Sequence, residues 1–481
     1  METRSIFGNI SPLDHRYSIS EKDIFDSLSL YLSEDAAIKG CIKAEVALVT
    51  AHLKVRGAWN QSAELQLEQA EHGITPQEVY AEEEKTKHNI RALVNVLKLK
   101  LGDHLSPLVH LGATSVDILD TSLSYRIKGA TQQVLLPLLA KLELSLCDFV
   151  EKEAGTPQVG RTHGQHAVPI TAGFAIAEYV SRLGKSILEI KRLSTTLKGK
   201  LSGAVGAYNA TSMIVRDPIE LESLYLGALG LESGEHSTQL VEPEYLLRLL
   251  LEFNTTFGII ANLADDLRHL QRSEIGELRE GFAETQVGSS TMPQKRNPWN
   301  SEHVKSLWKA FMPRVLTFFM DQISEHQRDL SNSASGRFVA DYITGFAMAV
   351  SRMHGVIKGL QADGERMLAN LTGAGGGIEG GVMAEPAYIL LAQSGISDAH
   401  EVIRRITLRC EESHCSFSLG LANEEEALRR ITESLFKLGI IQNNKTEDAL
   451  GFFAAPQRYR GLAYEKAKAL SKKYKELMSD I

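Results

Sequence analysis

"EPEYLLRLLLEFNTTFGIIANLADDLRHLQRSEIGELRE" (residues 242–280) is a long, apolar segment without proline after Pro243. Between Tyr245 and Asn262 only Arg248 and Glu252 are charged. A helix that is apolar over most of its circumference must be buried inside a bundle or at a subunit interface. The segment therefore predicts a long buried helix.

Two other segments predict helices of comparable length. They cover residues 170–201 and 301–330, and Pro313 is expected to kink the second one. Alternation of apolar and polar residues with a period of two is nearly absent, whereas helical periodicity recurs throughout the chain. Antiparallel packing of such helices gives an elongated bundle. The sequence therefore predicts an all-α fold.

The 481 residues are too many for one ordinary core, so two or three domains are expected. Residues 1–112 contain shorter helical pieces, and a glycine-rich segment, "LTGAGGGIEGGVMAEP" (371–386), marks another boundary. We predict an N-terminal helical domain over 1–112, a central helical bundle domain over 113–364 and a C-terminal helical domain over 365–481.

The composition of the chain limits the kinds of partner that the protein is expected to bind. The net charge of −8 argues against a nucleic-acid surface, which needs clustered Lys and Arg, but it leaves room for a small anionic ligand. The first residues lack the apolar core of a signal peptide, and no uninterrupted apolar run reaches the length of a membrane span. We expect a cytoplasmic protein without a nucleic-acid or membrane partner.

The segment "CEESHC" (410–415) raises the question of a metal site. Cys410, His414 and Cys415 supply at most three ligands, and no matching second pair occurs elsewhere. Four cysteines in a chain of this length do not indicate a disulfide framework. Buried or surface thiols are the favoured interpretation.

The segment "VGSSTMPQKRNP" (287–298) is small, cationic and rich in hydroxyls, and it lies between two helix-forming segments. Gly288 and the adjacent serines can present backbone N–H groups to an anion, and Lys295 adds a positive charge. Serine acts as a base only where its surroundings lower its pKa, and the same groups would stabilise an oxyanion. The alternative, a solvated linker, stays open on this segment alone.

Three more polar clusters border the apolar helices. Residues 159–169 contain His163 and His166, residues 110–121 place Thr114 and Ser115 at an expected helix start, and residues 84–94 contain His88 and Asn89. A lone histidine is more often a surface or capping residue than a catalyst. Four such clusters together indicate one composite site.

The motifs "GSSTMPQKRNP", "RTHGQ" and "GATSVD" resemble the signatures of the fumarase/aspartase superfamily, whose members eliminate fumarate or a close relative from a substituted succinate. Argininosuccinate lyase, class II fumarase, aspartase and carboxymuconate cycloisomerase share these motifs. Five further segments resemble the adenylosuccinate lyase family within it: "SPLDHRY", "EKTKHN", "SGAVGAYNA", "STQLVEP" and "QRDLSNSASGRF". The resemblance covers residues 8–465.

The resemblance implies a three-domain, all-α homotetramer in which three subunits contribute to each active site. It implies β-elimination of fumarate from adenylosuccinate, giving AMP, and from the succinyl-aminoimidazole-carboxamide ribotide of purine synthesis. The substrate would be a small anionic nucleotide that carries a succinyl group. Neither a metal nor an organic cofactor is expected.

The resemblance also implies roles for individual residues. Ser289 would be the base and His163 the acid, Lys295 would stabilise the developing negative charge, and Glu302 would orient His163. Lys87, His88 and Asn89 would orient the substrate, Thr114 and Ser115 would contact a succinyl carboxylate, and the phosphate and nucleotide would be held by Arg16, Tyr17, Arg328, Ser333 and Arg337. Gln239 would bind the succinyl side, and Asn297 would assist Lys295.

Two positions depart from the family pattern. Asn89 stands where the family commonly has Asp, and His303 stands where many members have an Arg. Both are substrate-binding positions, so they bear on the leaving group rather than on the elimination. The alternatives are another superfamily lyase, such as argininosuccinate lyase or a carboxymuconate cycloisomerase, and a catalytically silent structural protein on the same scaffold.

Overall fold

A computed structural model describes residues 5–282, 288–329, 331–373 and 378–481. The chain forms two compact units. Unit 1 comprises Met1–Leu139, Lys185–Gly258 and Ser306–Ser351, and unit 2 comprises Ala140–Gly184, Ile259–Lys305 and Arg352–Ile481. The boundaries between the units fall inside five helices, α8 (Leu136–Lys152), α9 (Ala172–Ser194), α11 (Glu244–Leu270), α12 (Trp299–Phe311) and α14 (Val339–Lys358). The three-domain division predicted from the sequence stays a prediction.

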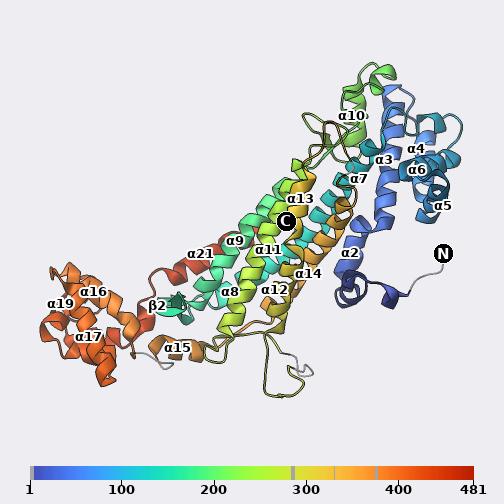
Figure 1. Ribbon diagram of the computed structural model, residues 1–481. Coiled ribbons are helices and arrows are strands. Elements are labelled where there is room, and N and C mark those ends of the chain that lie inside the picture. Colours follow the sequence, from blue (N-terminus) through green and yellow to red (C-terminus); the bar gives the residue numbers. More distant parts are fainter. Residues whose placement is uncertain (1–4, 283–287, 330, 374–377) are drawn as a thin grey trace. The chain divides into compact units, whose positions relative to one another are not determined.

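The described residues of unit 1 form helices and loops together with one short parallel pair of strands, and Figure 1 shows the helices. The remaining helices of this unit are α1 (Ser18–Ser20), α2 (Lys22–Leu32), α3 (Glu34–Val55), α4 (Gln61–His72), α5 (Pro76–Thr86), α6 (Asn89–Lys100), α7 (Ser115–Ala130), α10 (Pro218–Gly227) and α13 (Arg314–Asp321), and the strands are β3 (Lys198–Gly199) and β4 (Glu232–Ser233). Local capping sets several helix starts. Thr75, for example, accepts from the N–H of Glu78, whose carboxylate accepts from the N–H of Thr75, and Pro76 follows at the first helical position.

The helix predicted from 242–280 is present as α11, which ends at Leu270. In unit 1, Phe253 and Phe257 of this helix are fully buried. The centroids of their rings lie 5.4 and 5.5 Å, respectively, from the ring centroid of Phe346 on α14. Among the described helices α11 alone is long and apolar enough to cross a membrane, and 56% of its most apolar window is buried within the chain. A core helix of a bundle passes the same test.

Unit 2 contains a β-hairpin that the sequence did not predict. Strands β1 (Pro157–Thr162) and β2 (Gln165–Thr171) pair antiparallel directly before α9. Polar residues occupy both faces of the hairpin near its turn, so the alternation that identifies a half-buried strand is missing. The helix predicted over 170–201 accordingly begins at Ala172 and ends at Ser194.

The helix predicted over 301–330 is shorter than expected. It breaks at Pro313, which lacks the N–H needed to continue the helix, into α12 and α13. The second piece ends at Asp321, and the described residues up to Ala334 form turns instead of helix. Polar residues that favour turns, such as Ser324 and Asn332, are frequent in this stretch.

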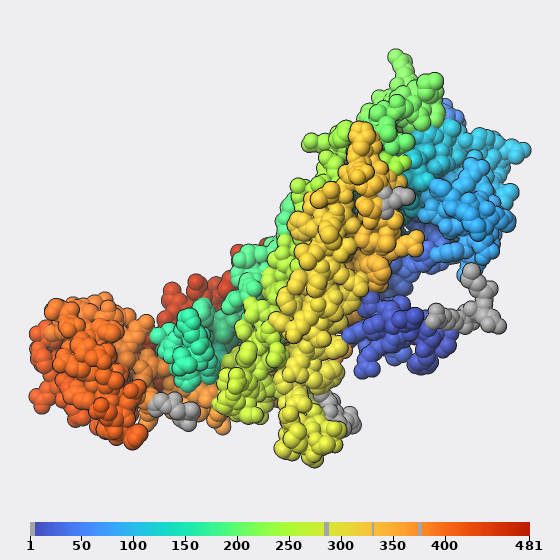
Figure 2. All heavy atoms as spheres, viewed as in Figure 1, coloured from blue at the N-terminus to red at the C-terminus, as the bar shows by residue number. Residues whose placement is uncertain are grey.

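The rest of unit 2 consists of a helical group and a short strand pair. The helices are α15 (Gly364–Thr372), α16 (Ala384–Gln393), α17 (Ala399–Ser413), α18 (Phe417–Ala422), α19 (Glu425–Lys437), α20 (Thr446–Phe453) and α21 (Ala463–Met478), and the strands are β5 (Leu278–Arg279) and β6 (Gln361–Ala362). Helices α16 to α20 share one apolar core, seen as the compact orange group of atoms in Figure 2. Cys410 and Cys415, at the end of α17 and just after it, are free thiols. The fold class predicted from the sequence, all-α, is confirmed.

Candidate active site

Residues 288–298 of unit 2 form a loop that is closed by its own hydrogen bonds. The Oγ of Ser289 accepts from the backbone N–H groups of Thr291 (3.4 Å) and Met292 (3.1 Å). At the other end of the loop the Asn297 side chain donates to the carbonyl of Gly288 over 3.1 Å. Donors directed at the Ser289 oxygen favour its deprotonated form, because negative charge there would strengthen both bonds.

Gly288 lets the two ends of this loop approach each other. A Cβ atom at this position would lie 2.2 Å from the carbonyl oxygen of Lys295, which is far inside van der Waals contact. The loop is also attached to its surroundings, since Gln271 donates to the carbonyl of Arg296 (3.2 Å) and the Arg296 guanidinium lies over the ring of Phe282. Residues 288–297 therefore form a loop with a defined conformation. These internal contacts argue against the alternative that the segment is a solvated linker.

A cavity of about 630 Å³ lies between this loop and the C-terminal end of α11. Its lining includes the basic side chains of Arg268, Arg272, Lys295 and Arg296, together with Asn297 and Glu302. Basic residues predominate, so the cavity suits an anion. Of these residues Lys295, Asn297 and Glu302 were predicted from the sequence as site residues, whereas Arg268, Arg272 and Arg296 were not. Arg268 lies in the last turn of α11, where a cation interacts favourably with the helix dipole, and Arg272 follows the end of the helix.

Glu302 lies in the first turn of α12, and its carboxylate is 3.9 Å from Nε of Arg268. The start of α12 is held by Glu280, which accepts from the backbone N–H groups of Ser301 (2.8 Å) and Asn300 (3.3 Å) and from both side chains. Glu280 thereby fixes the end of the loop and the beginning of the helix that presents Glu302 to the cavity.

His163 occupies the exposed two-residue turn of the β1–β2 hairpin. Its φ is 54° and that of Gly164 is 74°, the combination found in tight hairpin turns. Among the described residues, no hydrogen bond or ion pair joins His163 to Glu302 or Ser289. The pairing of Glu302 with His163 therefore stays a prediction. His166, across the hairpin from Arg161, has its pKa lowered by burial and by the Arg161 guanidinium.

The base of this hairpin is held by Glu277, which is fully buried. Arg161 donates to both carboxylate oxygens of Glu277, over 2.6 and 3.0 Å. Gln158 and Asn370 donate to the same carboxylate, over 2.7 and 2.8 Å. Sequence reasoning missed Glu277 and Glu280 because both lie in the segment predicted as one continuous helix.

In unit 1 three of the predicted substrate-binding residues come together from separate segments. Gln239 donates to the hydroxyl of Thr114 (3.4 Å), and Arg328 donates to the side-chain carbonyl of Gln239 (3.2 Å). The three side chains are partly exposed, so a ligand can reach them. Nothing in the sequence alone places residues 114, 239 and 328 together, and this cluster supports their assignment to one binding site.

A buried ion pair lies next to this cluster and holds the backbone of Thr114. Asp117 accepts from the N–H of Thr114 (2.8 Å) and pairs with Lys200, and both charged side chains are almost completely buried. Asp117 also accepts from the N–H of Gly203, so it joins the start of α7 to the loop of residues 202–210. Thr114 and Ser115 stand at the N-terminus of α7, as predicted from the sequence.

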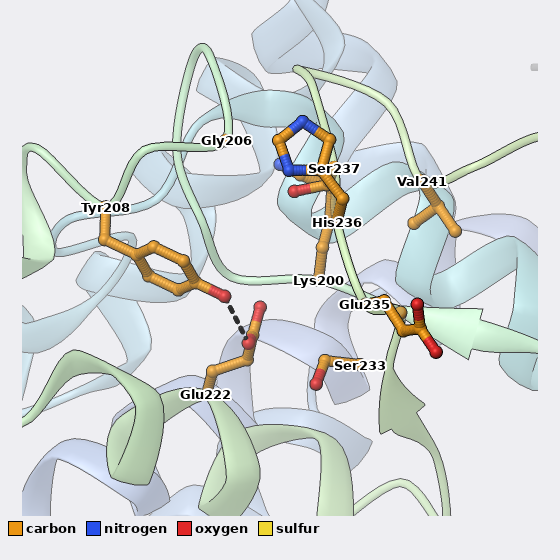
Figure 3. Close-up of a pocket in the computed structure, with 11 residues that line it drawn as sticks. Lys200, Gly206, Tyr208, Glu222, Ser233, Glu235, His236, Ser237 and Val241 are labelled. Carbon is orange, nitrogen blue, oxygen red and sulfur yellow. Dashed lines mark hydrogen bonds between the residues drawn. The ribbon is translucent and has the colours of Figure 1, made fainter.

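The loop of residues 233–241, which carries Gln239, is backed by a small cavity of about 60 Å³ (Figure 3). Figure 3 shows Tyr208 directed at Glu222, to which its hydroxyl donates over 2.7 Å, with His236 and Ser237 on the opposite side. Gly206 adopts a positive φ of 78° here, and a Cβ atom would lie 2.0 Å from the carbonyl of Ser237. The cavity is too small for a nucleotide.

Asp120 follows one turn after Asp117 and accepts from the N–H of Val241 over 3.0 Å. Burial raises the pKa of Asp120 to about 6, although Val241 N–H, Lys200 and Arg328 each act in the opposite direction. The carboxylate therefore adds negative charge close to Arg328 only as the pH approaches neutrality.

The other predicted residues lie elsewhere in unit 1. His88 caps the N-terminus of α6, where its Nδ1 accepts from the N–H of Arg91 (3.2 Å), so the neutral ring carries its proton on Nε2 and presents a donor. Lys87 ends α5 in the left-handed region, and Asn89 is the first residue of α6. The remaining four are found in or beside short helical turns: Arg16 and Tyr17 at 13–17, Ser333 and Arg337 near 335–338.

Comparison with known proteins identifies the family. The family described as lyase matches residues 4–310, and the adenylosuccinate lyase C-terminal family matches residues 324–438. The chain is 32% identical to adenylosuccinate lyase of Pyrococcus horikoshii over 88% of this chain and 92% of the relative. It is 29% identical to the adenylosuccinate lyase of Archaeoglobus fulgidus over 98% of this chain and 99% of the relative.

Solved structures agree at the level of the fold. A 3-carboxy-cis,cis-muconate lactonizing enzyme from Pseudomonas putida superposes with a TM-score of 0.78 at 23% identity and covers 94% of this chain and 97% of its own. A fumarate lyase from Mesorhizobium sp. gives a TM-score of 0.76 at 20% identity, over 93% and 97% of the two chains. The two family matches and the 32% identity to a known adenylosuccinate lyase show that the chain belongs to the adenylosuccinate lyase family of the fumarase/aspartase superfamily.

Proposed function

We propose that this protein cleaves adenylosuccinate into AMP and fumarate, and that it also removes fumarate from the succinyl-aminoimidazole-carboxamide ribotide. The observation that carries the proposal is the Ser289 loop, in which two backbone N–H groups point at one hydroxyl beside a cavity lined by Lys295 and Asn297. The match to the adenylosuccinate lyase C-terminal family favours this substrate over argininosuccinate.

In the proposed reaction, the Ser289 oxygen removes a proton from the carbon next to a succinyl carboxylate. The electron pair of that C–H bond first moves onto the carboxylate, and Lys295 and Asn297 stabilise the resulting charge. The charge then returns to form the double bond of fumarate while the C–N bond breaks. His163 donates a proton to the departing nitrogen, so the amine of AMP leaves uncharged.

Substrate binding is proposed for the unit 1 cluster and its surroundings. Thr114 and Gln239, already joined by a hydrogen bond, offer a hydroxyl and an amide to a succinyl carboxylate. Arg328 adds a guanidinium next to them, which suits a carboxylate or a phosphate. His88, with its Nε2 donor, would orient the substrate, and the nucleotide would be held by Arg16, Tyr17, Ser333 and Arg337. Neither a metal nor an organic cofactor takes part in these steps.

We further propose that the protein is a homotetramer whose sites combine residues from three subunits. The support is the exposed position of His163 and the fact that, among the described residues of the single chain, no hydrogen bond or ion pair joins it to its expected partner Glu302. A neighbouring copy is the natural source of that contact in a closed symmetric assembly. The cytoplasmic location stays a prediction from composition.

The direct test is release of fumarate, followed by its ultraviolet absorbance, from adenylosuccinate and, separately, from argininosuccinate. We expect turnover of the first and of the succinyl-aminoimidazole-carboxamide ribotide, and none of the second. Turnover of argininosuccinate alone would assign another lyase of the superfamily. Loss of turnover on all three substrates, in a folded protein that binds none of them, would favour the silent structural protein.

A further inference from the structure

The position of the turn that carries His163 depends on the two strands that it connects. His163 is an L-residue in the left-handed region, which is uncommon for residues other than glycine. The turn itself is exposed, and Gly164 has nothing within 4 Å of the place where a Cβ would stand. Neighbouring side chains therefore do little to fix the imidazole, and its position depends on the strands below it.

Those strands are fixed mainly through one buried carboxylate. Arg161 lies two residues before His163, and its guanidinium makes a bidentate pair with Glu277. Gln158, near the start of the same strand, donates to Glu277 as well, and Asn370 of α15 donates from the other side. All four lone-pair directions of the carboxylate are thereby engaged, which gives the anchor a single geometry.

The backbone of Glu277 is anchored too. Its N–H donates to the carbonyl of Leu270 at the end of α11, and its carbonyl accepts from the N–H of Asp363 before α15. A strand irregularity between Val159 and Arg161 lies between the two hairpin residues, Gln158 and Arg161, that donate to Glu277. Glu277 thus connects the hairpin, α11 and α15 at one point in unit 2.

We infer that Glu277 is a positioning residue for the general acid: through Arg161 and Gln158 it sets the orientation of the β1–β2 turn and so the place of His163. The inference rests on the proposed function, in which His163 protonates the leaving nitrogen. Glu277 touches neither the substrate nor the reacting atoms. Its effect on the reaction should consequently appear in kcat and depend on the presence of the histidine.

The test compares Glu277→Gln with wild type and with a matched control, Arg279→Gln. The Gln side chain keeps the size of Glu277 but loses the bidentate charged pair. We expect kcat to fall by about 10- to 100-fold, the usual effect of displacing a catalytic group through its supporting residues, with KM changed by less than about threefold. Arg279, in the short strand β5 that directly follows Glu277, forms an exposed pair with Asp363 (2.9 Å), and its replacement should leave kcat within about twofold.

A double-mutant cycle separates positioning from general structural damage. If Glu277 acts through His163, Glu277→Gln lowers kcat in the wild-type background but leaves unchanged the residual kcat of His163→Ala, which is measured at high enzyme concentration. If the loss of kcat in the double variant equals the product of the losses in the two single variants, the inference is overturned. An unchanged kcat in Glu277→Gln would also overturn it. If Glu277→Gln does not fold, Arg161→Lys, which keeps the charge but not the fork, is taken through the same cycle.

The same experiment keeps the two proposals apart. Full activity of His163→Ala would remove the acid from the proposed mechanism, and with it the reason for positioning. An inactive His163→Ala beside a fully active Glu277→Gln would leave the mechanism standing and reject Glu277 alone.

Discussion

Ser289 and Ser290 are adjacent hydroxyls with different surroundings. Ser289 accepts two backbone N–H groups, whereas Ser290 is exposed. We expect Ser289→Ala to lower kcat by at least about 100-fold, because the base is lost, and Ser290→Ala to stay within about threefold of wild type. Steady-state kinetics on adenylosuccinate, with circular dichroism to verify folding, shows which of the two serines is the base. The reverse pattern would make Ser290 the base.

Asp120 gives a prediction for the pH dependence of stability. Its pKa is about 6 in the folded protein and near 3.8 in an unfolded chain. The folded state thus retains the proton where the unfolded state has lost it, so this stabilisation is complete below about pH 3.8 and is lost as the pH rises to about 6. Asp120→Asn, which is always neutral, should raise Tm above that of wild type at pH 8.

The size of this effect should be a few degrees, since ~1 kcal/mol corresponds to roughly 2–4 °C in a unit of this size. Thermal unfolding of both proteins at pH 4 and at pH 8 measures it. At pH 4 the two Tm values should lie closer together. A difference that is the same at both pH values would show that Asp120 is not the group that titrates.

At the scale of elements, Gly184 controls how closely α9 and α21 pack in unit 2. A Cβ atom at this position would lie 2.2 Å from Cδ1 of Tyr474, whose buried ring rests on the glycine. The same Cβ would be 2.9 Å from the carboxyl of Glu143 on α8, which is fully buried. Burial raises the pKa of the Glu143 carboxyl well above its usual range.

We expect Gly184→Ala to destabilise the protein despite the better helix propensity of alanine. Overpacking typically costs about 1–3 kcal/mol, which exceeds the ~1 kcal/mol gained by replacing glycine in a helix. Gly355→Ala is the matched control, because Gly355 lies within α14 with nothing within 4 Å of its would-be Cβ. Thermal unfolding should show a lower Tm for the first variant and an equal or higher Tm for the second. A raised Tm for Gly184→Ala would mean that α21 can move away from α9 at little cost in free energy.

The elements also show what a sequence can and cannot reveal. The apolar face of α11 and the break at Pro313 were predictable because each follows from local residues. The β1–β2 hairpin was not, because polar residues near its turn leave no alternation and because the pair that anchors it, Arg161 with Glu277, joins residues far apart in the chain. Non-local contacts of this kind leave no periodic pattern.

At the scale of the whole molecule, the same distinction applies to the site. The loop at Ser289 could be predicted because its glycine, serines and lysine are contiguous. The contact of Thr114, Gln239 and Arg328 could be expected only from the family resemblance, since three separate segments supply it. The anchors Glu277 and Glu280 emerged only from the fold.

The tetramer proposal leads to the last prediction. In the described part of one chain, no hydrogen bond or ion pair joins His163 to Ser289 or Glu302, and the turn that carries it is exposed. If a site takes these residues from different subunits, inactive His163→Ala tetramers and inactive Ser289→Ala tetramers should regain activity after subunit exchange. Random exchange would give about a quarter of the sites both intact residues.

The experiment needs hybrid tetramers verified by native mass spectrometry and a parallel exchange of each variant with itself. Self-exchanged samples should stay inactive, and the mixed sample should approach about a quarter of wild-type activity at equal subunit ratio. The value of KM in the mixture should match wild type, because the restored sites contain every binding residue. Hybrid tetramers that stay as inactive as their parents would mean that His163 and Ser289 act within one subunit. The hairpin would then have to move toward its own Ser289 loop for catalysis, and the anchoring by Glu277 would oppose the reaction instead of supporting it.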